Sequence, residues 1–169
     1  MPDSNGVVRA LVKLVEVVRI LGTAVGFVLA YGVWGDPTPA ESIRILALTL
    51  AVPMCGTCAL EGLFLSRATA REKGYASKGE PAINPYQIQN AMWFLAATLI
   101  GLVWGLFAPD ATRAFVLYVV LILGFFLLSA INHSWQAIVH GNRTWQNLDR
   151  PFLAAAMVGG SLPIILSAS

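Results

Sequence analysis

Three side chains with acid–base or amide chemistry occur inside stretches that are otherwise apolar: Glu61, Asn90 and His133. If these stretches are membrane-spanning helices with a rise of about 1.5 Å per residue, all three side chains lie roughly 7–10 Å below the same membrane surface, the one predicted to be cytoplasmic. An ionisable group at that depth in a membrane is costly, and it usually faces the protein interior or a cavity. The sequence therefore predicts one polar layer in which Glu61 and His133 are candidates for an acid–base pair.

Two interpretations of this layer remain open. In one, Glu61 is a structural carboxylate that is either protonated or hydrogen-bonded to Asn, Gln or His. In the other, the layer is a site open to the cytoplasmic leaflet, where the pair could move protons near neutral pH. The further candidates for ligand contacts lie on the two segments that carry Asn90 and His133, and they are Gln89, Asn90, Trp93, Ser129, Asn132, Trp135 and Gln136.

Redox, haem and metal chemistry are less well supported by the residue pattern. Cys55 and Cys58 form a Cys-x-x-Cys pair that could exchange with a quinone, but they fall near mid-membrane, and free Cys often serves as a small apolar residue. The two histidines, His133 and His140, lie on one segment, so they cannot ligate one haem from both faces within a single chain. Glu61, His133 and Cys58 do not have a standard metal-ligand spacing. We therefore predict no cofactor and no metal site.

The composition indicates the environment of these residues. The chain has 169 residues, of which 57% are hydrophobic and 12% charged, and its mean hydropathy is +0.69. Soluble domains are about 25% charged. We therefore expect an integral membrane protein with a single domain over residues 1–169. The net charge of +2 and the lack of a basic run argue against nucleic-acid binding.

Five apolar segments are evident. They span residues 17–34, 42–65, 85–107, 113–138 and 151–166, and the first has a charged helical extension back to about residue 7. Hydrocarbon requires internally satisfied backbone hydrogen bonds, so each segment is predicted to be an α-helix. The fold class is thus an all-α polytopic bundle of five transmembrane helices, or four if the short last segment is only partly inserted. Pro151 is suited to the first turn of that last helix.

The stretch NPYQIQN explains how the third helix begins. Asn84, Pro85 and Gln87 fit the N-cap, first and third helical positions, where Asn caps, Pro is tolerated and Gln reaches back to the cap. Gln89 and Asn90 lie beyond the first turn, so this explanation does not account for them.

Basic residues predict the orientation. Nine of the eleven Lys and Arg residues fall on one side of the five-helix topology, and Arg44 and Arg113 fall on the other. The side rich in Lys and Arg is normally cytoplasmic. We expect a bacterial inner (cytoplasmic) membrane, a cytoplasmic N-terminus and, with five spans, a periplasmic C-terminus.

Small residues recur every four positions in three segments. The sets are Gly22, Gly26 and Ala30; Ala97, Gly101 and Gly105; and Ala155 with Gly159, beside Ala156 with Gly160. Such faces let membrane helices approach closely. They fit packing within one subunit, and they also fit a homo-oligomer or contacts with other membrane subunits.

The chain resembles a family of small bacterial and archaeal membrane proteins of unknown function. The resemblance rests on NPYQIQNAMWFLA opening one helix, INHSWQAIVHGN ending the next, and LDRP before the last. The positions that match the family's pattern are Pro85, Tyr86, Gln87, His133, Gln136 and Asp149. The resemblance implies a shared polar core over roughly residues 61–163, and it implies no activity.

Two functions follow as hypotheses. The first is a structural or accessory membrane protein that packs into a homo-oligomer or a larger inner-membrane complex. The second is a small enzyme or binding protein for a lipid-soluble molecule, such as an isoprenoid, quinone or sterol-like compound, that uses Glu61 and His133.

Overall fold

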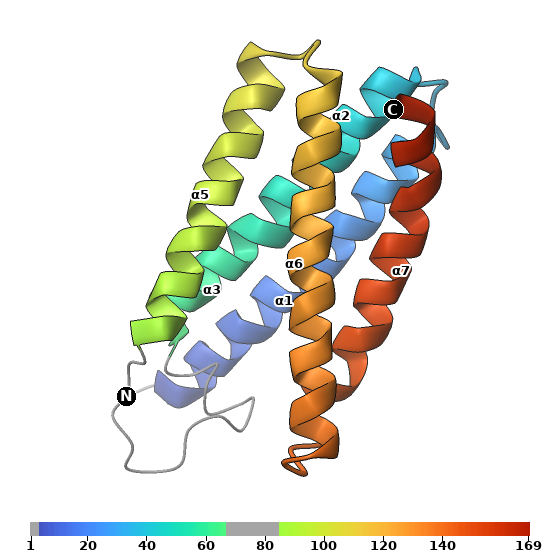
Figure 1. Cartoon of the computed structure of the whole chain (residues 1–169). Helices are drawn as coiled ribbons and strands as arrows, with labels where there is room; N and C mark the ends of the chain where they lie inside the picture. Colours follow the sequence, from blue (N-terminus) through green and yellow to red (C-terminus); the bar gives the residue numbers. More distant parts are fainter. Residues whose placement is uncertain (1–3, 67–84) are drawn as a thin grey trace.

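The protein is an all-α helix bundle, seen here in a computed structural model that describes residues 4–66 and 85–169 (Figure 1). Three long single helices are α5 (Pro85–Phe107), α6 (Thr112–Ile138) and α7 (Trp145–Ala168). Helix α1 covers Ser4–Ala30. Between α1 and α5, helices α2 (Pro39–Thr49), η1 (Leu50–Gly56) and α3 (Thr57–Phe64) follow one another directly and form one rod.

Four of these helical rods are long and apolar enough to cross a membrane. They are Pro39–Phe64, Tyr86–Phe107, Thr112–Ile138 and Asn147–Ala168. The last predicted span thus meets the requirement for length and hydropathy. Helix α1 has 27 residues, but Lys13, Glu16 and Arg19 lie along it, and it is not among the four. The uncertainty between four and five spans therefore concerns the first helix and not the last.

Helix α7 begins earlier than the sequence pattern predicted. It starts at Trp145, so Pro151 lies inside the helix and not in its first turn. Thr144 precedes the helix in an extended conformation, and its carbonyl accepts a 3.0 Å bond from the backbone N–H of Asn147. The polar loop sequence that suggested a later start is therefore already the first helical turn.

The central rod contains a π-helical segment, η1, around Pro53. Proline has no backbone N–H, so it cannot continue the regular hydrogen-bond ladder of an α-helix. A wider helical turn absorbs this interruption without ending the helix, and such turns are frequent at functional sites. The segment therefore alters the direction in which the residues after it point.

The first two small-residue faces bring α1 and α5 onto this rod. A Cβ atom added at Gly26 would lie 2.0 Å from Thr49 Oγ1, and one at Gly22 would lie 2.6 Å from Pro53 Cβ. On the other side, an added Cβ at Gly101 would lie 2.5 Å from Ala51 Cβ. These close approaches require glycine, so both faces serve packing within the chain.

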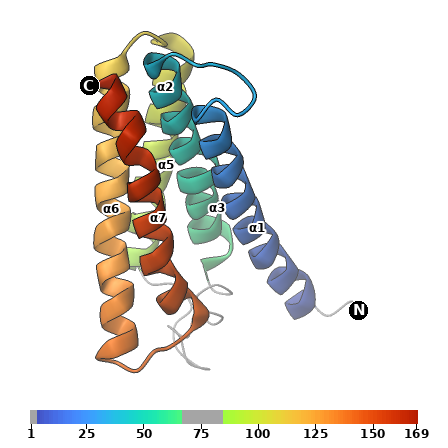
Figure 2. The ribbon, with the colours of Figure 1, turned by 90° about the vertical axis from the view of Figure 1, so that its right-hand side faces the viewer.

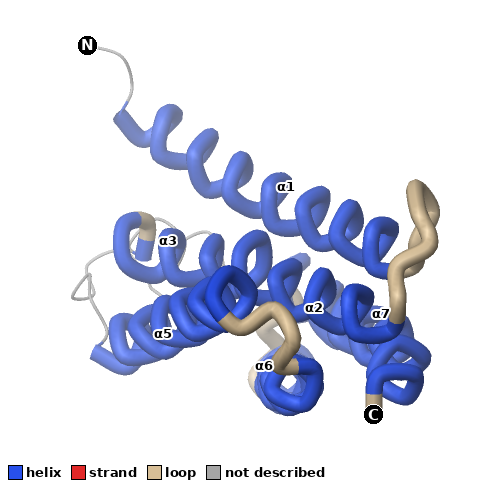
Figure 3. Tube along the Cα trace, turned by 90° about the horizontal axis from the view of Figure 1, so that it is seen from above, coloured by secondary structure: helices blue, strands red, loops and turns tan. Residues whose placement is uncertain are grey.

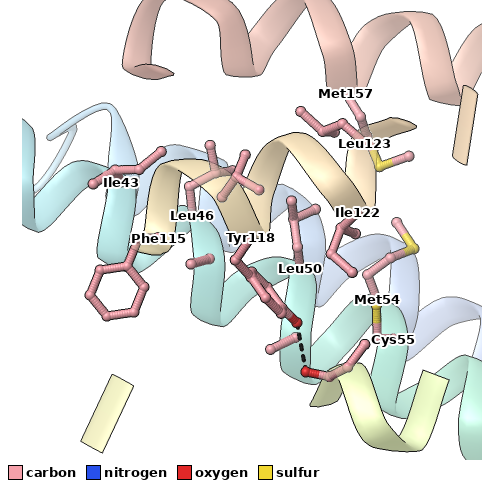
Figure 4. Close-up of a cluster of buried hydrophobic side chains, with 14 of the residues drawn as sticks. Ile43, Leu46, Leu50, Met54, Cys55, Phe115, Tyr118, Ile122, Leu123 and Met157 are labelled. Carbon is pink, nitrogen blue, oxygen red and sulfur yellow. Dashed lines mark hydrogen bonds between the residues drawn. The ribbon is translucent and has the colours of Figure 1, made fainter. Parts of the chain in front are cut away.

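The rod is the centre of the bundle. Viewed from above, it runs between α1 on one side and α5 on the other, and α6 and α7 also pack against α2 (Figure 3). The core between the central rod and α6 contains fully buried Leu46, Leu50, Phe115 and Ile122 (Figure 4). The Tyr118 hydroxyl lies in the same core and donates a 2.9 Å bond to the Ala97 carbonyl.

Helix α1 diverges from the bundle toward its N-terminal end. Figure 2 shows α1 leaning away from the other helices at that end, whereas α6 and α7 stay side by side along their length. Helix α1 packs mainly on α2 and η1, and α7 packs mainly on α6 and α2. Helices α1 and α7 still meet toward the other end, where the Tyr31 hydroxyl donates a 2.5 Å bond to the Gly160 carbonyl.

Candidate binding site

A buried ion pair joins α1 to α3. Arg19 Nη2 donates to Glu61 Oε2, and the two side chains are only 7% and 9% exposed. Arg19 Nε donates a second bond of 2.9 Å to Thr57 Oγ1. Burying a charge is tolerated only where a partner and hydrogen bonds compensate for lost water. Arg19 meets both conditions, because its guanidinium donates to an anion and to a hydroxyl.

The π-helical segment places the two acceptors. The Thr57 hydroxyl lies 2.6 Å from the carbonyl of Pro53, to which it donates, so it satisfies an acceptor near the proline. Its oxygen then remains free to accept from Arg19. Thr57 and Glu61 are four residues apart, so they lie one above the other on the same helix face. One helix face therefore presents a hydroxyl and a carboxylate to a single guanidinium.

A cavity of about 430 Å³ lies beside this pair. Helix α1 and the start of α7 form two of its sides, and residues from the central rod and from α6 complete it. Arg19 itself lines the cavity, as do Cys58 and Ser129. The ion pair therefore lies at the wall of a cavity that α1 and α7 both line.

Polar and apolar groups occupy opposite ends of the cavity. Glu16, Arg19, Asp149 and Arg150 line the end nearest the start of α1 and α7. One to two helical turns further, the lining changes to apolar side chains from four elements, namely Phe27, Met54, Phe126 and Met157. From Glu16 to Phe27 the distance along α1 is about 16 Å at 1.5 Å per residue. The cavity is thus amphipathic along its length.

Two buried polar atoms in this lining have no hydrogen-bond partner within the described chain: Thr23 Oγ1 and Asp149 Oδ1. Thr23 is only 7% exposed and lies one helical turn beyond Arg19. Buried polar groups in folded proteins nearly always have a partner, so an unpartnered one indicates a functional constraint or a bound group. These two atoms therefore mark where a ligand would gain hydrogen bonds.

The structure gives Glu61 and His133 different partners. Glu61 pairs with Arg19, and His133 Nδ1 lies 2.6 Å from Asn147 Oδ1. Neither of these two bonds joins Glu61 to His133. Glu61 thus pairs with an arginine, whereas the structural interpretation from the sequence had considered only an amide or a histidine as its partner. Proton transfer between Glu61 and His133 stays a prediction.

The His133 bond belongs to a network that fixes the α6–α7 connection. Asn147 is 1% exposed, and its Nδ2 donates a 2.7 Å bond to the Asn142 carbonyl. A carbonyl can only accept, so the amide nitrogen faces Asn142 and the amide oxygen faces His133. His133 Nδ1 must therefore carry the proton in this bond. His133 therefore has a structural role, because its bond to Asn147 helps to hold the connection between α6 and α7.

The other predicted ligand contacts are dispersed. Ser129 lines the cavity, whereas Gln89 and Asn90 are exposed on α5, and Asn132 and Trp135 are exposed on α6. Gln136 is half-buried and is not part of the cavity lining. The predicted layer thus contributes one of these side chains to the hollow region, and ligand roles for the rest stay predictions.

Trp93 packs in an aromatic cluster between α5 and α6. Its ring stacks on Phe125 with centroids 4.4 Å apart, and Phe94 contacts Phe125 and Phe126 edge-on or offset. Phe126 belongs both to this cluster and to the cavity lining. Trp93 therefore supports the cavity wall from behind.

The cysteines are both free thiols with different surroundings. Cys55 is fully buried in the hydrophobic core, and Cys58 is half-buried at the cavity. Within residues 4–66 and 85–169, no group of three or more His, Cys, Asp or Glu side chains is arranged to hold a metal ion.

Sequence reasoning missed the residues that define the polar end of the cavity. It assigned no contact to Arg19 or Thr23, and it named Asp149 only as a position that matches the family's pattern. A signal was present: Arg19 lies two residues inside the first apolar segment, and an embedded Glu61 requires a cation.

The predicted N-cap at Asn84 lies outside the described residues, and Gln87 Nε2 donates to the Ser66 carbonyl at 3.3 Å.

Comparison with known proteins adds no assignment to this geometry, because no family model, curated protein or solved structure matches the chain.

Proposed function

We propose that the protein binds an amphipathic, lipid-soluble molecule in the cavity between α1 and α7. The observation that carries this proposal is the separation of charged and apolar side chains along one cavity. The polar end would hold the head of the ligand beside Arg19, and the apolar end would hold its hydrocarbon part near Phe27 and Met157. Lipid-soluble compounds that join a polar head to a hydrocarbon part belong to this chemical class.

The size of the cavity supports a small-molecule ligand. Its volume of about 430 Å³ falls within the range of about 300–1,000 Å³ that is typical of ligand pockets. Such pockets are mostly apolar, with a few polar groups that orient the ligand. Here the apolar wall comes from Met54, Phe126 and Met157, and the polar groups come from the beginnings of two neighbouring helices.

The proposed activity is ligand binding and not catalysis. The Arg19 guanidinium is already held by Glu61 and Thr57, so its charge is compensated and its position at the cavity wall is fixed. A group fixed before the ligand arrives loses little conformational freedom on binding. This arrangement suits recognition of a polar head.

The distribution of basic residues supports a cytoplasmic position for the polar end of the cavity. Arg143 and Arg150 lie near the beginning of α7, and α1 begins at the same end of the bundle (Figure 1). Arg44 and Arg113 lie at the other end. By the positive-inside rule, we propose a cytoplasmic N-terminus in a bacterial inner membrane. The ligand's head would then lie on the cytoplasmic side.

A pair of neighbouring substitutions tests the proposal. Ala156 lines the cavity, whereas Ala155 is exposed outside it. Ala156→Leu should fill part of the cavity, and Ala155→Leu should leave it open. Native mass spectrometry of protein extracted gently from membranes measures any retained lipid-soluble molecule. We expect retention by the unaltered protein and by Ala155→Leu, with loss in Ala156→Leu. Absence of any retained molecule from the unaltered protein, or equal retention in all three, contradicts the proposal.

Assembly into a homo-oligomer or with other membrane subunits remains a second candidate function, and one observation favours it. Ala155 and Gly159 on α7 are exposed, and a Cβ added at Gly159 would meet nothing within 4 Å. Among the residues that the structure describes, Gly159 therefore takes part in no close helix contact, unlike the glycines on α1 and α5.

Gly124 on α6 offers a matched control for this second candidate, because a Cβ added there would also meet nothing within 4 Å. If α7 forms an interface, Gly159→Leu should abolish cross-linked species in native membranes, and Gly124→Leu should not. A strictly monomeric unaltered protein with no co-purifying subunit contradicts this candidate.

A further inference from the structure

We infer that the cavity selects ligands whose head donates hydrogen bonds and carries positive charge, such as a protonated amine on a hydrocarbon chain. This inference rests on the proposed function and names its ligand class. It is carried by the unpartnered Asp149 Oδ1 and Thr23 Oγ1, both of which line the cavity.

The first step concerns the bonds that these atoms can make. An ionised carboxylate only accepts hydrogen bonds, and a hydroxyl both accepts and donates. A head with several N–H donors can therefore satisfy Asp149 and Thr23 together. Thr23 is only 7% exposed, so bulk water has little access to hydrogen-bond its hydroxyl in place of a ligand.

The second step concerns why Asp149 is not already paired with the neighbouring Arg150. Consecutive positions in a helix point in different directions and do not face each other. The structure accordingly contains no hydrogen bond between the two side chains within the described residues. Asp149 thus lines the cavity without an ion pair to its neighbour, although Arg150 still attracts it electrostatically.

The third step concerns the charge at the polar end. Glu61 neutralises Arg19 through their ion pair, which leaves the carboxylates of Glu16 and Asp149 facing one further guanidinium, that of Arg150. Arg150 is only half-buried, so water screens it, while the Asp149 oxygen is buried. The buried part of the polar end is therefore negative, and a carboxylate or phosphate head would be repelled by the Asp149 oxygen.

A set of probes with one hydrocarbon chain and different heads tests this selection. The full chain in phosphatidylcholine nanodiscs is titrated with dodecylamine, dodecanol, dodecanoate and dodecyltrimethylammonium. We expect dodecylamine to bind about tenfold or more tightly than dodecanoate, a difference equivalent to about 1.4 kcal/mol. Dodecyltrimethylammonium carries charge but no N–H donor, so it should bind more weakly than the amine.

Asp149→Asn removes the charge at the proposed acceptor and keeps its shape. The unaltered protein should also bind dodecylamine more tightly than the uncharged dodecanol, and in this variant the two should bind about equally. Asp110→Asn, at an exposed aspartate between α5 and α6, is the matched control and should keep the preference. If Asp149→Asn fails to fold, the comparison of the four probes on the unaltered protein still decides.

The outcomes separate the two proposals. Equal affinity for the amine, alcohol and carboxylate, or dodecyltrimethylammonium binding as tightly as dodecylamine, overturns the head selection and leaves the binding function in place. A tighter carboxylate overturns it as well. Absence of binding by every probe, together with absence of a retained native molecule, overturns the binding function itself.

Discussion

Arg19 and Glu61 are 42 residues apart in the chain, yet they share one buried hydrogen-bonded ion pair that fastens α1 to α3. Helix α1 is not among the four helices that are long and apolar enough to cross a membrane, and Arg19 is one of the charged residues along it. The pair neutralises this charge inside the bundle. It therefore explains how a helix with charged residues can pack against the central rod.

Removal of one partner should destabilise the protein strongly. Glu61→Gln leaves the Arg19 charge buried without an anion, and breaking a buried pair typically costs about 3–5 kcal/mol. The Arg19→Met, Glu61→Met double variant removes both charges and should recover most of this loss. The free energy of unfolding in mild detergent measures the effect. The single variants Arg19→Met and Glu61→Met complete the comparison, and a loss in the double variant equal to the sum of their losses would contradict a direct pairing.

Close packing of α1 on the rod should make Gly26 intolerant of any side chain. An alanine Cβ there would overlap Thr49, whose Cβ would lie only 2.6 Å away, so the helices must separate. Overpacking of this kind costs about 1–3 kcal/mol. Gly124→Ala meets open space and should be neutral or stabilising by up to about 1 kcal/mol, because alanine favours the helix. Thermal unfolding of the two variants should therefore shift in opposite directions, and equal shifts would argue against the close approach.

The His133–Asn147 bond should appear as coupling between the two residues. A double-mutant cycle with His133→Ala and Asn147→Ala should give a coupling of about 1 kcal/mol in unfolding free energy. Acidification should not remove it, because protonation at Nε2 leaves the Nδ1–H in place. His140→Ala, at an exposed histidine, should show no coupling with Asn147→Ala. Coupling that disappears on acidification would show that Nδ1 is not the donor.

The two cysteines should react at different rates with a small, membrane-permeant maleimide. Cys58 lines the cavity and is half-buried, whereas Cys55 is fully buried in the core. We expect modification of Cys58 in the native protein and modification of Cys55 only after unfolding, as measured by mass spectrometry of the peptides. The Cys58→Ser variant provides the control for single-site reaction. Faster labelling of Cys55 would contradict the described packing.

Local sequence patterns were sufficient for the helices because each pattern is carried by neighbouring residues. Apolar runs of membrane length predicted the four rods, and the bounds of α5 agree with the prediction at both ends. Glycines every four residues predicted close helix contacts, because this spacing places them on one face. The start of α7 was wrong, because the local bonds of Asn147 with Thr144 and Asn142 are not visible in a hydropathy pattern.

The pairing of polar groups was decided by the tertiary structure alone. The sequence identified Glu61 and His133 as buried polar residues, since a polar residue in an apolar run is a local feature. It did not indicate that Arg19 would be the partner of Glu61, because that depends on how α1 crosses the rod and on the wide turn at Pro53. The cavity likewise arises from the divergence of α1 and α7, two helices far apart in the chain. Depth in the membrane can be counted along one helix, but which helix faces which depends on packing between distant segments.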